Sequence, residues 1–185
     1  IVLKNSNENR YDSEGFISGL DNEWNIAYLE VRGVGEYGWD PNLQWHVRRA
    51  SAWTGRTLAS MQVYDLLRCI EFCRTLDGVD AGSIGIAARD EMGVVALYAA
   101  LLDGKCKTIM LKNPPESQDV ASSPDGRGEA IEILNCLRIT DLRQIPALLA
   151  PAEIIFIGEM PGSYKWSEDL LNKLGIKSIT RIDSL

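Results

Sequence analysis

Residues 83–93 read SIGIAARDEMG, and they decide the fold. The apolar run at residues 84–88 is typical of a buried strand, and a helical pattern of small and apolar residues follows at residues 92–102. A tight polar turn with Asp90 at its centre joins the two. In parallel sheets, functional side chains lie at such carboxyl ends of strands, so this turn is the first candidate for a site.

Short apolar runs and helical patterns alternate along the rest of the chain. Strands are expected at residues 2–3, 26–31, 84–88, 108–111, 154–157 and 179–182, and helices at 13–20, 57–76, 92–102, 128–137, 141–149 and 163–174. Residues 32–55 are expected to form a long polar and aromatic loop. Short apolar strands between helices indicate a parallel sheet with helices on both faces. The predicted fold is a three-layer α/β/α domain with an open, mostly parallel sheet of about six strands.

Length and composition favour one soluble domain over residues 1–185, with 45% hydrophobic and 24% charged residues. The net charge of −7 argues against binding to nucleic acid or to an anionic membrane surface. No apolar run approaches the ~20 residues of a membrane span. Because Ile1 already lies in an apparent core strand, we expect a fragment of a longer protein, with that protein's other domains as partners.

The sequence predicts neither a metal nor a cofactor. The chain has four cysteines: Cys69, Cys73, Cys106 and Cys136. They form no C-x-x-C pair and occur with a single histidine, which argues against a zinc site. They read instead as small buried side chains. Gly33, Gly35 and Gly38 lack the Lys-Ser/Thr pair and the flanking strand and helix of a phosphate-binding loop.

Three segments carry a resemblance to a known family. Residues 28–36 read YLEVRGVGE, residues 79–86 read VDAGSIGI, and residues 141–158 lead into a predicted strand. Together with residues 83–93 they resemble the α/β-hydrolase superfamily. Within it they are most similar to bacterial acetyl xylan esterases, dienelactone hydrolases and prolyl-oligopeptidase-type domains. The resemblance implies a secreted or periplasmic location and a small-molecule or carbohydrate ester as ligand.

The resemblance also implies catalytic positions. The family uses a Ser at the strand–helix turn, an acid after strand 7 and a His after strand 8. Here Asp90 stands in place of the Ser, Glu159 follows the strand expected at 154–157, and the single histidine is His46. The expected protein is therefore an esterase-like domain without conventional serine-esterase activity. The alternative is an ester hydrolase that uses Asp90 as nucleophile, with Glu159 and a His from elsewhere or His46.

Five more residues are candidates for substrate binding: Trp39, Trp45, Arg89, Glu91 and Asn113. Tryptophan faces stack on sugar rings, Arg89 and Glu91 flank Asp90, and Asn113 follows the strand expected at 108–111. Simpler interpretations stand beside these. The acidic side chains suit any exposed turn at a helix N-terminus, and the tryptophans can pack the loop over the sheet.

Overall fold

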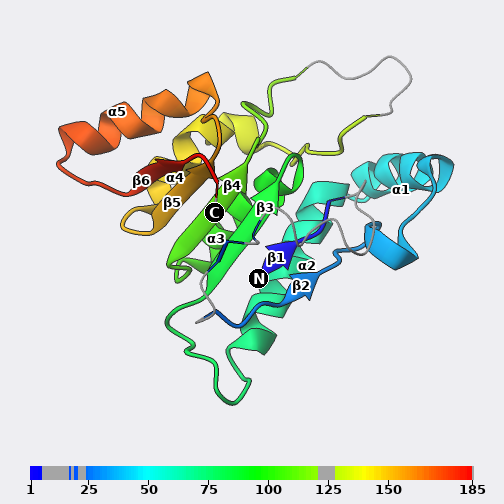
Figure 1. Cartoon of the computed structure of the whole chain (residues 1–185). Helices are drawn as coiled ribbons and strands as arrows, with labels where there is room; N and C mark the ends of the chain where they lie inside the picture. The colour runs from blue at the N-terminus through cyan, green and yellow to red at the C-terminus, as the bar shows by residue number, and fades with distance from the viewer. Residues whose placement is uncertain (6–16, 18, 21–23, 121–127, 185) are drawn as a thin grey trace.

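The computed structural model describes residues 1–5, 17, 19–20, 24–120 and 128–184. Within them, six strands form one sheet with the order β2-β1-β3-β4-β5-β6, and every neighbouring pair is parallel (Figure 1). The strands are β1 Val2–Leu3, β2 Tyr28–Leu29, β3 Gly85–Arg89, β4 Thr108–Lys112, β5 Glu153–Ile157 and β6 Ile179–Ile182. The predicted open parallel sheet of an α/β fold is confirmed.

The helices pack in a row, each against the next. They are α1 Pro41–Trp53, α2 Leu58–Cys73, α3 Met92–Asp103, α4 Ile145–Leu149 and α5 Lys165–Lys173. Helices α2, α3 and α4 share the main core with one face of the sheet, to which Leu3, Ile86 and Phe156 contribute. Helix α3 lies at the centre of this core and is buried almost all round, which explains its uninterrupted apolar sequence.

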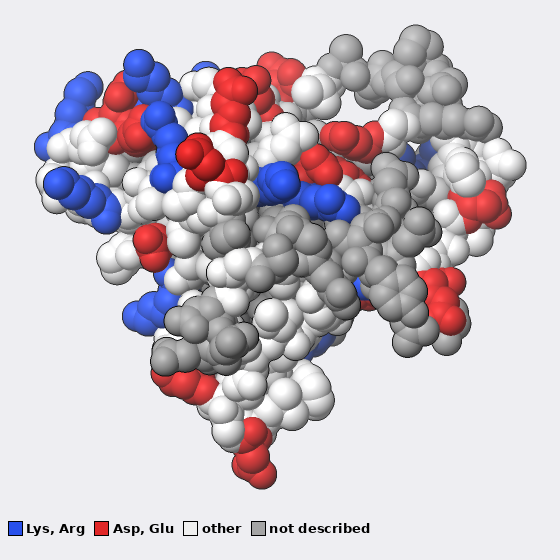
Figure 2. Space-filling view, in the orientation of Figure 1, with Lys and Arg blue, Asp and Glu red and all other residues white. Residues whose placement is uncertain are grey.

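The opposite face of the sheet has a smaller core of its own. Val2, Ala87 and Met110 pack there with Ile17, which is 2% exposed and comes from the segment between β1 and β2. Most of the helix predicted at residues 13–20 lies outside the described residues. Figure 2, in the orientation of Figure 1, shows acidic side chains gathered over the upper ends of the strands, where the sheet has its carboxyl edge.

Two predicted elements differ from the structure. Residues 32–55 are not one loop, because they contain α1. Asp40 caps this helix by accepting hydrogen bonds from the backbone of Asn42 (2.8 Å) and Leu43 (3.1 Å), and Pro41 starts it. Helix α1 buries no residue fully, and its sequence is polar on average. Conversely, the helix predicted at residues 128–137 does not form. Asn135 has a φ of 61°, and a short 3-10 helix, Cys136–Arg138, follows it.

Candidate functional site

The turn between β3 and α3 is sharp and places Asp90 at the carboxyl edge of the sheet. Asp90 has a φ of 49°, in the left-handed region that Asp and Asn tolerate better than other non-glycine residues. Its backbone N–H donates to the carbonyl of Lys112 (3.0 Å), and its carbonyl accepts from Gly93 (2.9 Å). A Cβ on Gly93 would lie 2.9 Å from the Cβ of Pro114, so the glycine lets α3 start directly against the segment after β4.

Both carboxylate oxygens of Asp90 accept hydrogen bonds from side-chain amides. Asn5 donates to Oδ2 (3.1 Å) and Asn113 donates to Oδ1 (2.8 Å). Asn5 also donates to Oε2 of Glu91 (2.8 Å) and is 4% exposed. The two amides follow β1 and β4, the strands on either side of β3. The Asp90 carboxylate is thus held in one orientation, as an acceptor, by neighbouring strand ends.

A pocket of about 470 Å³ opens above these strand ends. Its described lining is mostly acidic and amide side chains with three prolines: Asn5, Arg89, Asp90, Glu91, Asn113, Pro114, Pro115, Glu116, Glu129 and Pro161. We call it the elbow pocket. The buried Tyr164 fixes its outer wall, because its hydroxyl donates to the carbonyl of Pro115 (2.7 Å). The lining therefore favours uncharged or cationic ligands that donate hydrogen bonds.

No protein-family model matches the chain, and no curated protein matches it. Solved structures with a similar fold include the following two. One, from Bacteroides fragilis, is assigned as an acetyl xylan esterase: the TM-score is 0.65 and the identity 12%, over 83% of this chain and 45% of that one. The fold is of the α/β-hydrolase type. The other is an acylaminoacyl peptidase from Pyrococcus horikoshii, with a TM-score of 0.53 and 20% identity over 84% of this chain and 26% of that one.

The chain therefore spans less than half the length of either similar protein. In the part of the chain that the structure describes, no helix is long and apolar enough to cross a membrane. The same residues include no group of three His, Cys, Asp or Glu side chains that would suit a metal ion.

The structure brings four of the predicted site residues together. Arg89, Asp90, Glu91 and Asn113 all line the elbow pocket. They do so because β3 and β4 are parallel neighbours in register, with Arg89 opposite Lys112, so both chains leave the sheet at the same edge.

The other predicted residues do not belong to the described lining of this pocket. The ring of Trp39 packs against Gly33, where a Cβ would lie 2.8 Å from it. Trp45 lies on α1, with the guanidinium of Arg49 4.5 Å from its ring centroid and the ring of His46 at 4.9 Å. The ring contacts of Trp39 and Trp45 are thus with the chain's own residues.

The two remaining catalytic candidates are exposed. His46 lies on α1, and Glu159 follows β5, two residues before Pro161 of the elbow pocket. The catalytic roles predicted for Asp90, Glu159 and His46 stay predictions.

Sequence reasoning missed Asn5 and Glu129. Asn5 follows the strand expected at residues 2–3, so the carboxyl-end rule could have found it. Glu129 follows a long irregular stretch, and no local signal placed it at the site. Burial raises the pKa of Glu129, and the nearby carboxylates of Glu91 and Asp90 raise it further.

This raised pKa makes the stability of the fold depend on pH. Because ionised Glu129 is disfavoured in the folded state, the protein loses stability as the pH rises through the folded pKa. We expect Glu129→Gln to raise the melting temperature near pH 7 by about 1–3 °C, and the gain to shrink toward pH 4. Thermal unfolding, monitored by circular dichroism near pH 7 and near pH 4, measures the melting temperature at each pH. Asp77→Asn, which removes an exposed charge away from the site, is the control. Equal effects of Glu129→Gln at both pH values would contradict the prediction.

Proposed function

We propose that the chain forms a single α/β-hydrolase-type domain, related to carbohydrate esterases, that binds a neutral carbohydrate in the elbow pocket and lacks conventional serine-esterase activity. One observation carries the proposal. The residue on the strand–helix turn after β3 is Asp90, and side-chain amides donate hydrogen bonds to both of its carboxylate oxygens. A carboxylate fixed in this way is a preorganised acceptor for ligand hydroxyl groups.

The remaining lining supports a carbohydrate. Sugar hydroxyls both donate and accept hydrogen bonds, which suits the mixture of carboxylates, amides and Arg89. Pro114, Pro115 and Pro161 add apolar surface against which the C–H face of a ring can pack. The fold similarity to a protein assigned as an acetyl xylan esterase agrees with this ligand class.

Calorimetric titration with xylotetraose tests the proposal, together with a p-nitrophenyl acetate assay. We expect xylotetraose to bind to the wild type. Asp90→Gly should lower the affinity for it at least tenfold, which corresponds to about 1.4 kcal/mol of binding free energy. Glycine is the right replacement, because it accepts the φ of 49° while it removes the carboxylate. Asp77→Asn is the charge control. We expect no more ester turnover from the wild type than from Asp90→Gly. A chain that binds none of xylotetraose, cellotetraose and mannotetraose would overturn the proposal.

The left-handed backbone of Asp90 on the strand–helix turn favours a second candidate, an ester hydrolase with Asp90 as nucleophile. A carboxylate oxygen would bond to the acyl carbon, the bond to the leaving alcohol would break, and a water activated by a His would hydrolyse the intermediate. Mass spectrometry after acid quench of a p-nitrophenyl acetate reaction distinguishes the candidates. An adduct on Asp90, with turnover that Asp90→Asn abolishes, would establish this one in place of the first.

A further inference from the structure

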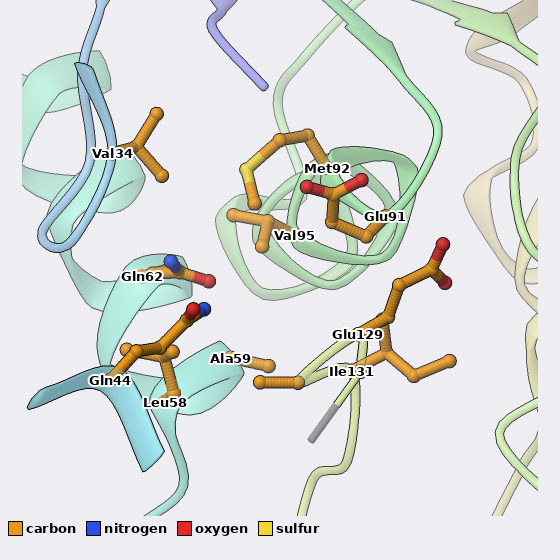
Figure 3. Close-up of a pocket in the computed structure, with 12 residues that line it drawn as sticks. Val34, Gln44, Leu58, Ala59, Gln62, Glu91, Met92, Val95, Glu129 and Ile131 are labelled. Atoms are coloured by element: carbon orange, nitrogen blue, oxygen red, sulfur yellow. The ribbon is translucent and has the colours of Figure 1, made fainter. Parts of the chain in front are cut away.

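Helix α1 turns a mostly polar side toward the rest of the molecule. Four half-buried residues on this side follow the helical repeat, and three of them are polar: Gln44, Val47, Arg48 and Ser51. Gln44 lines a cavity of about 290 Å³ that α1 shares with α2 and α3 (Figure 3). Arg48 forms a bidentate ion pair with Glu132, at 2.6 and 2.8 Å. The contacts that hold α1 in place are therefore largely polar.

The opposite side of α1 is more apolar and is exposed. Leu43 and Trp53 are 46% and 89% exposed. His46 and Ala50 stand between them and are exposed as well. The four positions follow the spacing i, i+3, i+7, i+10 of the a and d residues in a coiled coil, and we call them the α1 stripe. A helix normally packs its apolar side against its own protein, so an apolar side turned to solvent indicates a surface for a partner.

The charge around the α1 stripe is positive, although the chain carries a net charge of −7. Residues 41–64 contain three arginines and no Asp or Glu. Arg49 and Arg56 are exposed, and neither forms an ion pair with a described residue. The guanidinium of Arg49 lies 4.5 Å from the centroid of the Trp45 ring, which holds it beside the stripe. This charge favours an acidic partner over a second copy of α1, which would bring like charges together.

We propose that the α1 stripe binds an acidic amphipathic helix of a partner protein. From Leu43 to Trp53 the stripe is about 15 Å long, which matches roughly three turns of a partner helix. Apolar side chains of the partner pack on Leu43 and Trp53 and over the small Ala50 between them. Its carboxylates pair with Arg49, which stands at the g position beside the stripe. A contact of this length is smaller than a standard interface, so the binding is reversible.

Fluorescence anisotropy with a labelled model peptide tests the proposal. The probe is an amphipathic helix of about three heptads, with Leu at positions a and d and Glu at positions e and g, where like charges prevent it from pairing with itself. We expect saturable binding of this acidic peptide. An analogue with Lys in place of each Glu should bind about tenfold more weakly. Added salt should weaken the binding of the acidic peptide. Equal affinities for the two peptides would overturn the proposal.

Trp53→Ala is the main variant, because a side chain that is 89% exposed contributes little to folding. It should weaken the acidic peptide about tenfold, since aromatic anchors carry much of the binding energy of an interface. Arg49→Gln should weaken it about threefold and reduce its dependence on salt. Phe72→Ala removes an aromatic side chain on α2 that is 62% exposed, and this control should leave the affinity unchanged. An unchanged affinity in Trp53→Ala would contradict the assignment.

Two measurements detect other occupants of the α1 stripe. Sedimentation equilibrium of the chain alone tests for a second copy, and a dimer that Trp53→Ala abolishes would place that copy on the stripe. Titration with oligothymidine tests for nucleic acid. We expect no dimer and no binding of oligothymidine, and either result in the opposite direction would overturn the proposal. Trp53→Ala should still bind xylotetraose with wild-type affinity, because Trp53 does not line the elbow pocket.

Discussion

Glu30→Gln is expected to lower the free energy of unfolding by about 2–3 kcal/mol, because it leaves a buried ammonium group without its counter-ion. The Lys4 side chain is 7% exposed, and its Nζ lies 2.7 Å from Oε1 of Glu30. The second carboxylate oxygen accepts from the backbone N–H of Glu36 (3.1 Å). Since Asn5 is the next residue after Lys4, we also expect weaker xylotetraose binding. Urea unfolding and calorimetric titration measure the two effects.

A surface ion pair provides the matched control for Glu30. Arg68 and Glu71 are 52% and 54% exposed, so Glu71→Gln should cost less than about 0.5 kcal/mol. In the double variant Lys4→Met/Glu30→Gln no buried charge remains, and most of the lost stability should return. A similar loss in Glu30→Gln and Glu71→Gln would show that the burial of Lys4 is not the cause.

Arg74→Met is expected to destabilise the fold by about 3 kcal/mol near pH 7. Arg74 follows α2 and forms a bidentate pair with Asp103, the last residue of α3, at 2.5 and 2.8 Å. Their side chains are 17% and 7% exposed. The pair therefore ties together the ends of the two central helices, and its loss leaves the carboxylate of Asp103 almost buried without its cation.

The same pair gives this prediction a pH dependence. The Arg74 guanidinium lowers the pKa of Asp103 to about 2 from an ordinary value of 3.8. The stability that the pair provides is present above pH 4 and is lost as the pH falls toward 2, because the carboxyl must then be protonated. The difference between wild type and Arg74→Met in urea unfolding should therefore narrow from about pH 7 to about pH 2.5. A constant difference would mean that Arg74 acts through packing alone.

The sheet could be predicted from the sequence because its central strands are buried on both faces. Ile109 in β4 and Phe156 in β5 are both fully buried and stand in short apolar runs. Helix α1 was missed because it is polar and buries no residue fully, although the Asp40-Pro41 start signal was present. The capping residues at its start mark this helix, whereas its polar composition resembles that of a loop.

The candidate site was predictable to the extent that its residues follow strongly apolar strands. Asp90 and Asn113 satisfy that condition, and Asn5 follows a strand of only two residues. Glu129 reaches the elbow pocket through packing between distant segments, which no local pattern encodes. Trp39 and Trp45 were chosen for their chemistry, and the structure shows both rings in contact with residues near them in sequence.

The hydrogen bond between Asn5 and Asp90 joins residues 85 positions apart, while the bond from Asn113 to Asp90 spans 23. Closing the longer loop requires β1 to dock beside β3, and β1 contributes only two residues to the sheet. Long-range contacts of this kind form late, because the entropy of loop closure is lost before they stabilise the chain. We therefore expect the elbow pocket to be completed after β3 to β6 have paired, and a chain that has formed β3 to β6 alone to be compact and unable to bind. A binding measurement would then detect whether β1 has joined the sheet, whereas a measurement of secondary-structure content would not.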